Sequence, residues 1–395
     1  MIHRITKASL YIAAIMMFLS CERRNDNAPS DPDRIQFSAP ELEIQTKSGP
    51  VDALTAGDRF GVIGYCLANN IQTGETDYNS GTALWASKNS LCPPSVFYNQ
   101  PVNVTENGCE YDNPKYWYKD GFDLAGEPNP NIAGADNFHY TFFAYYPYDD
   151  VSGEGFDIIS PSSSEETGAP EFRFVMPFQT GDELDATLVP DAMLAVLYDR
   201  TRADGNLQFT FSHLLTALGF EVNNFSEQDV VVKKITLSGD FYRSITVDLT
   251  GSSVEYHTDD TYTGSYTILD QEIVLEAPDT DAGETMTSTS MIEGQDPLGG
   301  NHLLLISGDG GDDGFTYLGN NLRVTIEYSF GGIDREPATF SRPTTFTPRP
   351  GIKYTAQLNF VGDAFVLLFT VDNDEMWEDG EADDGSEDND DIIFE

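Results

Sequence analysis

The chain has 395 residues and a formal net charge of −45, which comes from 66 acidic and 21 basic side chains. This charge excludes nucleic acid as a partner, because no basic surface is left to neutralise phosphates, and it also repels an anionic membrane surface. The hydrophobic fraction of 39% is still enough for a folded core, so a globally disordered chain is not expected. The length allows two domains of ordinary size.

Residues 1–20 have the pattern of a lipoprotein signal peptide. A basic start precedes the apolar run LYIAAIMMFL at residues 10–19, which is too short for a transmembrane helix of about 20 apolar residues. Ser20 and Cys21 follow, an ending that resembles a bacterial lipobox with Cys21 as the lipidated residue. An ordinary signal peptide followed by a chance cysteine is the alternative. We expect lipidation at Cys21 and no other membrane segment.

The next stretch, residues 21–34, is polar, contains two prolines and has no periodicity, so a flexible tether is predicted. From Ile35 onward, apolar residues alternate with polar ones in short runs that are rich in β-branched and aromatic side chains and separated by turn signals. This period of two is typical of half-buried antiparallel strands. Only SHLLTALGF at residues 212–220 competes as a helix, and its alternation favours a strand. We therefore predict an all-β fold.

The polar segment YDRTRADGN at residues 198–206 separates two strand-rich halves of the chain. We place a domain boundary there, with an N-terminal β-sandwich at residues 35–202 and a C-terminal β-sandwich at residues 203–371. The remaining residues, 372–395, carry thirteen Asp or Glu and no Lys or Arg, and they form an acidic C-terminal tail.

Three cysteines remain after Cys21, namely Cys66, Cys92 and Cys109. They allow one disulfide within the chain, and the sequence does not choose among the three pairings. No CxxC occurs, so a zinc site is not supported.

Motifs of catalysis and cofactor binding do not occur in the sequence. None of the five histidines begins an HExxH, and Walker, GxSxG and GxGxxG patterns are missing. The acidic run SGDGGDDGF at residues 307–315 departs from the EF-hand spacing, so a solvated loop is favoured over a calcium site. His213 lies in an apolar context and is interpreted as a hydrogen-bonded structural residue. We expect no enzymatic activity, no cofactor and no metal.

Several motifs, in their order along the chain, resemble the fimbrillin family of Bacteroidales, the lipoprotein pilins and their relatives. Besides the lipobox and the tether, they are IQFSAPELEIQTKSG at 35–49, GDRFGVIGY at 57–65, FFAYYP at 142–147, FTFSHLLTALGFEV at 209–222, WEDG at 377–380 and DIIF at 391–394. The resemblance covers the whole mature chain. It implies two tandem transthyretin-like β-sandwich domains, which agrees with the strand pattern.

The resemblance also implies assembly by strand exchange. The precursor reaches the outer membrane as a lipoprotein, and a trypsin-like protease cuts after a basic residue beyond the first strand. Loss of that strand opens a hydrophobic groove, which a strand of a neighbouring subunit fills. Lys47 follows the first strand here and is the candidate cleavage site, whereas a cut at Arg34 would release the lipid but leave the groove closed. Arg59 lies inside the next predicted strand and should be protected.

The same resemblance nominates the strands that take part in the exchange. The candidate removable strand presents Ile35, Phe37, Leu42 and Ile44, and the candidate donor strand presents Ile392, Ile393 and Phe394.

We therefore predict a cell-surface fimbrial subunit, structural or adhesive. Its partners are other fimbrial subunits, the processing protease and the outer membrane through the lipid, with host or bacterial surface glycans or proteins as adhesion targets. The acidic tail is an awkward donor strand, because its like charges repel and an unpaired buried carboxylate is costly. This favours a tip, anchor or accessory subunit over a shaft subunit. The alternative is a glycan- or ligand-binding lipoprotein that does not polymerise, with aromatic loops that carry Trp85, Tyr111, Tyr116, Trp117 and Tyr118.

Overall fold

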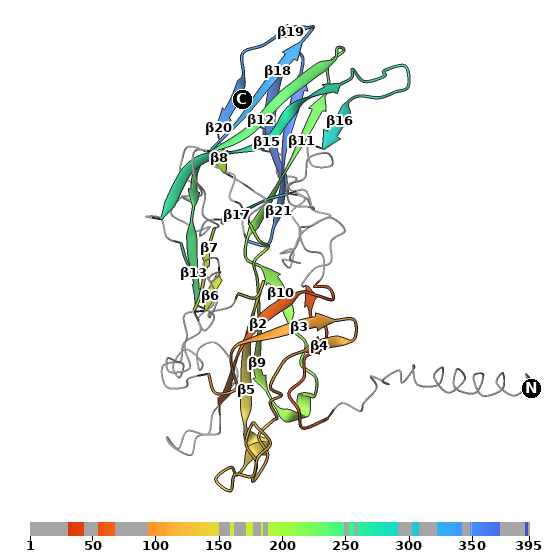
Figure 1. Ribbon diagram of the computed structural model, residues 1–395. Helices are drawn as coiled ribbons and strands as arrows, with labels where there is room; N and C mark the ends of the chain where they lie inside the picture. The colour runs from red at the N-terminus through yellow and green to blue at the C-terminus, as the bar shows by residue number, and fades with distance from the viewer. Residues whose placement is uncertain are drawn as a thin grey trace, which may run out of the picture. The chain divides into compact units, whose positions relative to one another are not determined.

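The chain is built almost entirely from β-strands wherever its structure is described, as the computed structural model in Figure 1 shows. The described residues are 31–42, 54–67, 94–149, 159–161, 171–176, 183–184, 189–248, 253–256, 260–290, 302–307, 322–341, 348, 350–371 and 392–393. Helix within them is limited to short 3₁₀ turns such as η2 (Ala135–Asn137) and η4 (Arg202–Asp204). Across these ranges no helix has the length and apolar character needed to cross a membrane. The prediction of an all-β fold is confirmed.

A seven-stranded sheet has the order β1-β10-β9-β5-β2-β3-β4. Its strands are β1 (Glu41–Leu42), β2 (Arg59–Leu67), β3 (Phe97–Thr105), β4 (Gly108–Glu110), β5 (His139–Tyr146), β9 (Met193–Arg200) and β10 (Thr210–His213). The neighbouring strands pair antiparallel, except that β1 runs parallel to β10. The N-terminal segment thus joins the edge of this sheet through a strand that is far away in the sequence.

Both faces of the seven-stranded sheet are covered at its centre, which explains why the middle residues of its central strand β5 are all buried. One face packs against a four-stranded sheet, where Tyr145 of β5 contacts Phe172 with ring centroids 5.3 Å apart. The other face packs against the N-terminal segment and the loop of residues 111–138. The four-stranded sheet contains β6 (Ile159–Pro161), β7 (Glu171–Val175), β13 (Ser244–Asp248) and β14 (Ser253–Tyr256).

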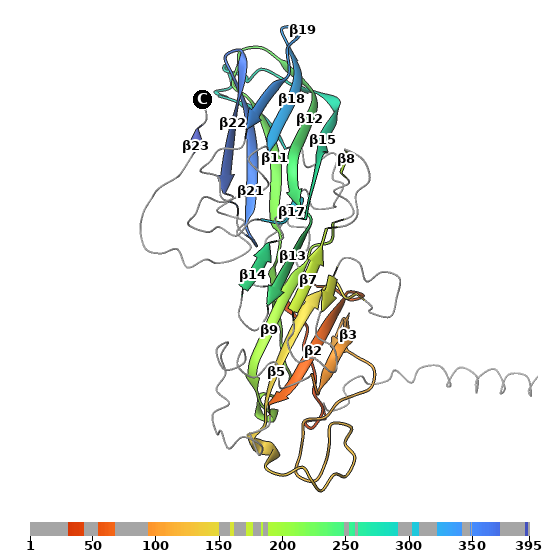
Figure 2. The ribbon, with the colours of Figure 1, turned by 90° about the vertical axis from the view of Figure 1, so that its left-hand side faces the viewer.

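Two six-stranded sheets form mainly from the later part of the chain, and Figure 2 labels strands of both, among them β21 and β22 of the first and β12, β15 and β18 of the second. The first contains β11 (Thr216–Asn224), β16 (Thr287–Ser290), β17 (Leu303–Leu305), β21 (Lys353–Val361), β22 (Ala364–Val371) and β23 (Ile392–Ile393). The second contains β8 (Glu183–Leu184), β12 (Val230–Tyr242), β15 (Thr261–Leu275), β18 (Arg323–Phe330), β19 (Ile333–Asp334) and β20 (Ala338–Ser341). Their inward-facing side chains share one core, in which Tyr328 of β18 contacts Phe365 of β22 at 4.9 Å between ring centroids.

One long hairpin passes through two of these sheets. β12 pairs with β15 in a six-stranded sheet, and after the single residue Arg243 the same strand continues as β13, which pairs with β14 and β7 in the four-stranded sheet. At this crossing the Arg243 amide donates to the carbonyl of Asp260 at 2.9 Å, and the Ser244 hydroxyl donates to the Asp260 carboxylate at 2.7 Å. The backbone therefore links the two sheets without a loop.

The predicted domain boundary at residue 202 falls between β9 and β10, which pair in the same sheet. Strands β13 and β14, later still in the sequence, pair with β7 or with each other. Strands from both sides of the boundary thus contribute to the early sheets, and the division into tandem transthyretin-like domains stays a prediction.

The segment FTFSHLLTALGFEV forms strands β10 and β11, as the alternation predicts, and not a helix. His213 ends β10 with a buried side chain, and its Nδ1 lies 2.9 Å from the carboxylate of Asp191. Its interpretation as a hydrogen-bonded structural histidine is confirmed.

Candidate functional site

The candidate site is the N-terminal segment of residues 35–42 together with the groove in which it lies. The segment runs beside residues 207–211, with Phe37 paired to Leu207 in a parallel bridge. The Leu207 amide donates to the carbonyl of Gln36, and the Ser38 amide donates to the carbonyl of Leu207, both at 2.8 Å. Further along the segment, the Glu41 amide donates to the carbonyl of Phe209 at 2.8 Å. These bonds make the segment an edge strand of the seven-stranded sheet.

The register of this pairing changes within the segment. Phe37 lies opposite Leu207, whereas Glu41 lies opposite Thr210, so the segment has one more residue than the strand that it follows. The extra residue falls in the stretch that contains Pro40, which has no amide hydrogen to donate to a neighbouring strand. The segment therefore binds in two parts, one around Phe37 and one at β1.

The side chains of the segment are part of the hydrophobic core on the face of the sheet that the segment covers. Ile35, Phe37 and Leu42 are all buried, and Phe37 is only 3% exposed. Four other rings surround that of Phe37, with centroids 5.4 to 6.1 Å away; they belong to Phe97, Tyr111, Phe142 and Phe209. Aromatic pairs at these separations add to the free energy gained from burial alone. Phe37 is thus the centre of an aromatic cluster to which strands β3, β5 and the approach to β10 contribute.

The loop that begins at Tyr111 holds the segment from its other side. The Tyr111 hydroxyl donates to the carbonyl of Ile35 at 2.6 Å, and the Ile35 amide donates to the carbonyl of Lys115 at 2.9 Å. The main chain around Ile35 therefore has hydrogen-bond partners on two sides, like that of an interior strand. The groove for this part of the segment is a slot between the loop and residues 207–211.

Cys109 lies against the middle of the segment. Its thiol donates to the carbonyl of Ser38 at 3.3 Å, and burial raises the pKa of this thiol to about 12. No disulfide joins Cys109 to Cys66, because the two residues lie beside opposite ends of β3. Cys109 is paired with Val104 near the C-terminal end of β3. Cys66 lies two residues after Gly64, which is paired with Phe97 at the N-terminal end.

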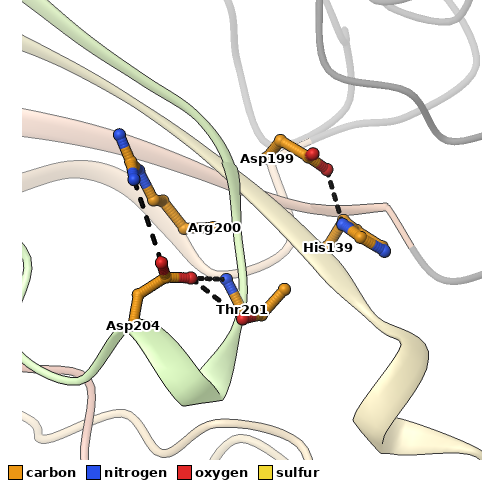
Figure 3. A network of polar contacts seen from close by, with 5 residues as sticks. All are labelled: His139, Asp199, Arg200, Thr201 and Asp204. Carbon is orange, nitrogen blue, oxygen red and sulfur yellow. Dashed lines mark hydrogen bonds and ion pairs between the residues drawn. The ribbon is translucent and has the colours of Figure 1, made fainter.

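A polar network stabilises the turn that precedes residues 207–211, the stretch that pairs with the N-terminal segment (Figure 3). Asp199 has φ 56°, a left-handed conformation that Asp adopts more readily than most residues, and His139 Nδ1 lies 2.5 Å from its carboxylate. The Asp204 carboxylate accepts from the Thr201 amide at 2.6 Å and lies 3.9 Å from the Arg200 guanidinium. These contacts stabilise the end of β9 and the turn η4, after which the chain reverses and pairs with the N-terminal segment.

Several residues predicted for the exchange lie outside the described residues, namely Cys21, Ile44, Lys47 and Phe394. Arg34 is half-buried in a turn, where its amide donates to the carbonyl of Asp31 at 3.0 Å. Arg59 begins β2 and pairs with Asn103, as expected of a residue inside a strand. Ile392 and Ile393 form β23, which pairs with Phe369 and Leu368 of β22.

The aromatic residues nominated for glycan stacking are largely part of the core. Trp117 is 2% exposed and packs edge-to-face on Tyr140 at 4.7 Å between ring centroids. Tyr111 is buried, and Tyr116 and Tyr118 are half-buried, while Trp85 lies outside the described residues. The idea that Trp117 and Tyr111 present a stacking surface is wrong, because both rings cover the sheet beneath them.

Residues 207–211 were not predicted from the sequence to form one wall of the groove. Leu207, Phe209 and Phe211 are all buried in the same cluster as Phe37, and their spacing of two is the signal of a strand face. That spacing carries no information on the strand's partner, so the contact with the N-terminal segment was not predictable from it. In the part of the chain that is described, no group of three or more His, Cys, Asp or Glu is placed to hold a metal ion.

We predict that Phe37→Ala lowers the free energy of unfolding by about 3–5 kcal/mol, because it leaves a cavity inside the aromatic cluster. The measurement is urea denaturation of the full chain. Phe122→Ala is the matched control, since Phe122 is 40% exposed and its loss should cost less than about 1 kcal/mol. Equal losses in the two variants would show that Phe37 is not central to the core.

We predict that Cys109 reacts with iodoacetamide far more slowly in the full chain than in a chain that begins at Ser48. The pKa near 12 keeps the thiol protonated at pH 9, and removal of the segment exposes it and returns the pKa toward about 8.5. Mass spectrometry measures the rate at each pH. In the full chain the rate should stay low at a pH where Cys109 of the shortened chain already reacts, and the same pH profile in both chains would contradict the contact with Ser38.

Comparison with known proteins gives a family for the chain. A family model described as fimbrillin-like matches residues 51–371. A search of curated proteins gives no match. Among solved structures, the chain is similar to a fimbrial protein from Bacteroides vulgatus, with 20% identity, a TM-score of 0.44, and coverage of 80% of this chain and 92% of that chain.

Two further solved structures are similar over most of their length. A fimbrial assembly protein from Parabacteroides distasonis has 10% identity and a TM-score of 0.34, with 86% of this chain and 96% of that chain covered. The tip fimbrial protein Mfa3 from Porphyromonas gingivalis has 9% identity and a TM-score of 0.33, with 86% and 98% covered. Because the family model spans most of the sequence, the chain belongs to the fimbrillin-like family.

Proposed function

We propose that this protein is a fimbrial subunit at the cell surface, structural or adhesive, that assembles by exchanging its N-terminal strand for a strand of another subunit. The observation that carries the proposal is the position of residues 35–42, whose buried side chains complete the core of a sheet that the rest of the chain builds. Lys47 follows shortly after Leu42, so one cut there separates the segment from the remainder of the chain. The role is structural, and it needs no catalytic residue.

Removal of the segment would leave defects that another strand can repair. The Leu207 amide, the Leu207 carbonyl and the Phe209 carbonyl would lose their partners, and the ring of Phe37 would leave a space inside the aromatic cluster. Unpaired main-chain groups and exposed apolar surface both cost free energy. An incoming strand with suitable apolar side chains restores both kinds of contact.

The C-terminus supplies a sequence with the required spacing. Residues 390–394 read DDIIF, and residues 33–37, which contain the first buried positions of the segment, read DRIQF. Alternate residues of a strand face the same side, so Ile392 and Phe394 would take the places of Ile35 and Phe37. Ile393 would then face the opposite side, where the segment has Gln36. This match supports the terminal residues as the donor strand despite the acidic tail before them.

We further propose that Cys21 carries a lipid that holds the precursor in the outer membrane, and that a trypsin-like protease releases it. A cut at Lys47 would free the subunit from its lipid and open the groove in one step. A cut at Arg34 would leave Ile35 and Phe37 in place. A tip, anchor or accessory position is favoured over a long shaft, because thirteen acidic residues precede or follow the short apolar end of the tail and their repulsion raises the free-energy cost of each further copy that is added.

We predict that brief trypsin treatment cuts after Lys47 and is followed by a ladder of oligomers on an unboiled gel. The matched control is Lys47→Gln, which should stay monomeric under the same treatment, and Arg34→Gln should assemble like the unaltered chain. A chain that is cut at Lys47 but stays monomeric would contradict strand exchange between copies of this protein.

We predict that Ile392→Ser and Phe394→Ser each weaken assembly of the trypsin-treated chain by about tenfold or more, because each buries a hydroxyl in an apolar position. Ile393→Ser is the matched control with the same change one residue away, and it should assemble normally. The yield of oligomers over a range of protein concentrations measures the effect. Equal loss in all three variants would show that the spacing does not set the register of the donor strand.

A further inference from the structure

Three large apolar side chains are exposed together at one end of the sheet that contains β16, β11 and β21. Met286 precedes β16, Phe225 follows β11 and Val361 ends β21; their side chains are 43%, 41% and 54% exposed. We call these three residues the apolar row. The three strands at whose ends they lie are hydrogen-bonded neighbours in the order β16-β11-β21.

Extending the strand register by one residue places the three side chains side by side. Asn224 pairs with Thr287 on one side and with Phe360 on the other, so the next position brings Phe225 between Met286 and Val361. The pairing continues to this position, because the Phe225 amide donates to the carbonyl of Phe360 at 2.9 Å. Residues opposite each other on adjacent strands are close enough for their side chains to touch.

The apolar row faces away from the core. Asn224 and Phe360 are fully buried, and successive side chains of a strand point to opposite faces of the sheet. Phe225 and Val361 therefore lie on the outer face. On that face the preceding row is polar and covered: the Asn223 side chain is 2% exposed, and its amide donates to the Asn359 side-chain oxygen at 2.9 Å. The apolar row is thus a bounded stripe at the end of the strands, unlike single exposed apolar residues, which are common on protein surfaces.

The chain segments that carry the apolar row are acidic, and the nearest cation that the described residues place at this end of the sheet is Arg335, which packs on the Phe330 ring. The segments 225–229, 276–286 and 361–364, which bring its residues to this end of the sheet, contain no Lys, Arg or His. Their acidic residues are all exposed, namely Glu227, Asp229, Glu276, Asp279, Asp281, Glu284 and Asp363. A negative surround repels anionic lipid and a second copy of this chain, and it attracts a cationic partner.

We infer that the apolar row is a docking surface for a polypeptide segment of another protein that carries Lys or Arg beside apolar side chains. The apolar side chains of the partner cover Met286, Phe225 and Val361, and its cations lie among the surrounding carboxylates. This surface is separate from the groove of the N-terminal segment, so it does not depend on strand exchange. The apolar contact supplies affinity, and the charges supply fast association and partner choice.

Binding of synthetic peptides to the full chain tests this inference. The probe is a fluorescent peptide of alternating Lys and Leu, compared with a peptide of alternating Lys and Ser and one of alternating Glu and Leu. We expect the Lys–Leu peptide to bind about tenfold more tightly than the Lys–Ser peptide, the Glu–Leu peptide not to bind, and added salt to weaken binding. Equal affinity for the Lys–Leu and Lys–Ser peptides would overturn the inference.

A pair of variants separates the apolar row from the general negative charge. Phe225→Ser with Val361→Thr should lower the affinity for the Lys–Leu peptide about tenfold. Val274→Thr is the matched control, since Val274 is 59% exposed and lies on β15 in the other six-stranded sheet; it should bind like the unaltered chain. Equal effects of the two changes, or no effect of the first, would show that charge alone attracts the peptide. Met286→Gln gives the same test if the double variant does not fold.

Discussion

The insertion of Phe37 among four other aromatic rings is the contact on which the N-terminal part of the structure depends. The ring belongs to a segment that is remote in sequence from every ring that it touches. Its backbone joins the sheet through only a few hydrogen bonds, so most of its binding free energy comes from apolar burial. A side chain that is central to a core but carried on a segment far away in the sequence makes the stability of that core depend on the segment being in place.

The central strands β2 and β5 of the sheet that receives Phe37 have almost no side chains left facing solvent. One side packs on the four-stranded sheet and the other on the segment and the loop from Tyr111, so β5 has consecutive buried side chains where a half-exposed strand would alternate. A sheet of this kind cannot tolerate the loss of one cover. In the strand exchange that we propose, this dependence has a use, because the strand of a neighbouring subunit would replace the missing cover with a contact of comparable strength.

The sequence allowed the strands and the all-β class to be predicted, because side-chain alternation is a local property. It also placed His213 in the interior, since apolar residues flank it on both sides. The parallel pairing of Phe37 with Leu207 could not be predicted, because alternation does not indicate which strand is the neighbour and the two residues are 170 positions apart. Trp117 misled for a related reason: a Trp in a loop rich in Asn, Asp and Gly has the composition of a binding loop, and only the fold shows that the loop lies flat on the sheet.

The strand that passes through Arg243 has a mechanical consequence. Because β12 continues directly into β13, a pull that tends to separate the six-stranded sheet from the four-stranded one acts on covalent backbone, with no flexible linker to extend first. Before the two sheets can part, the pairs from Ser244 to Asp248 must break, and those pairs lie along the strand and resist together. Tension on the subunit is therefore carried in shear by several hydrogen bonds between β13 and its neighbours, which must break together.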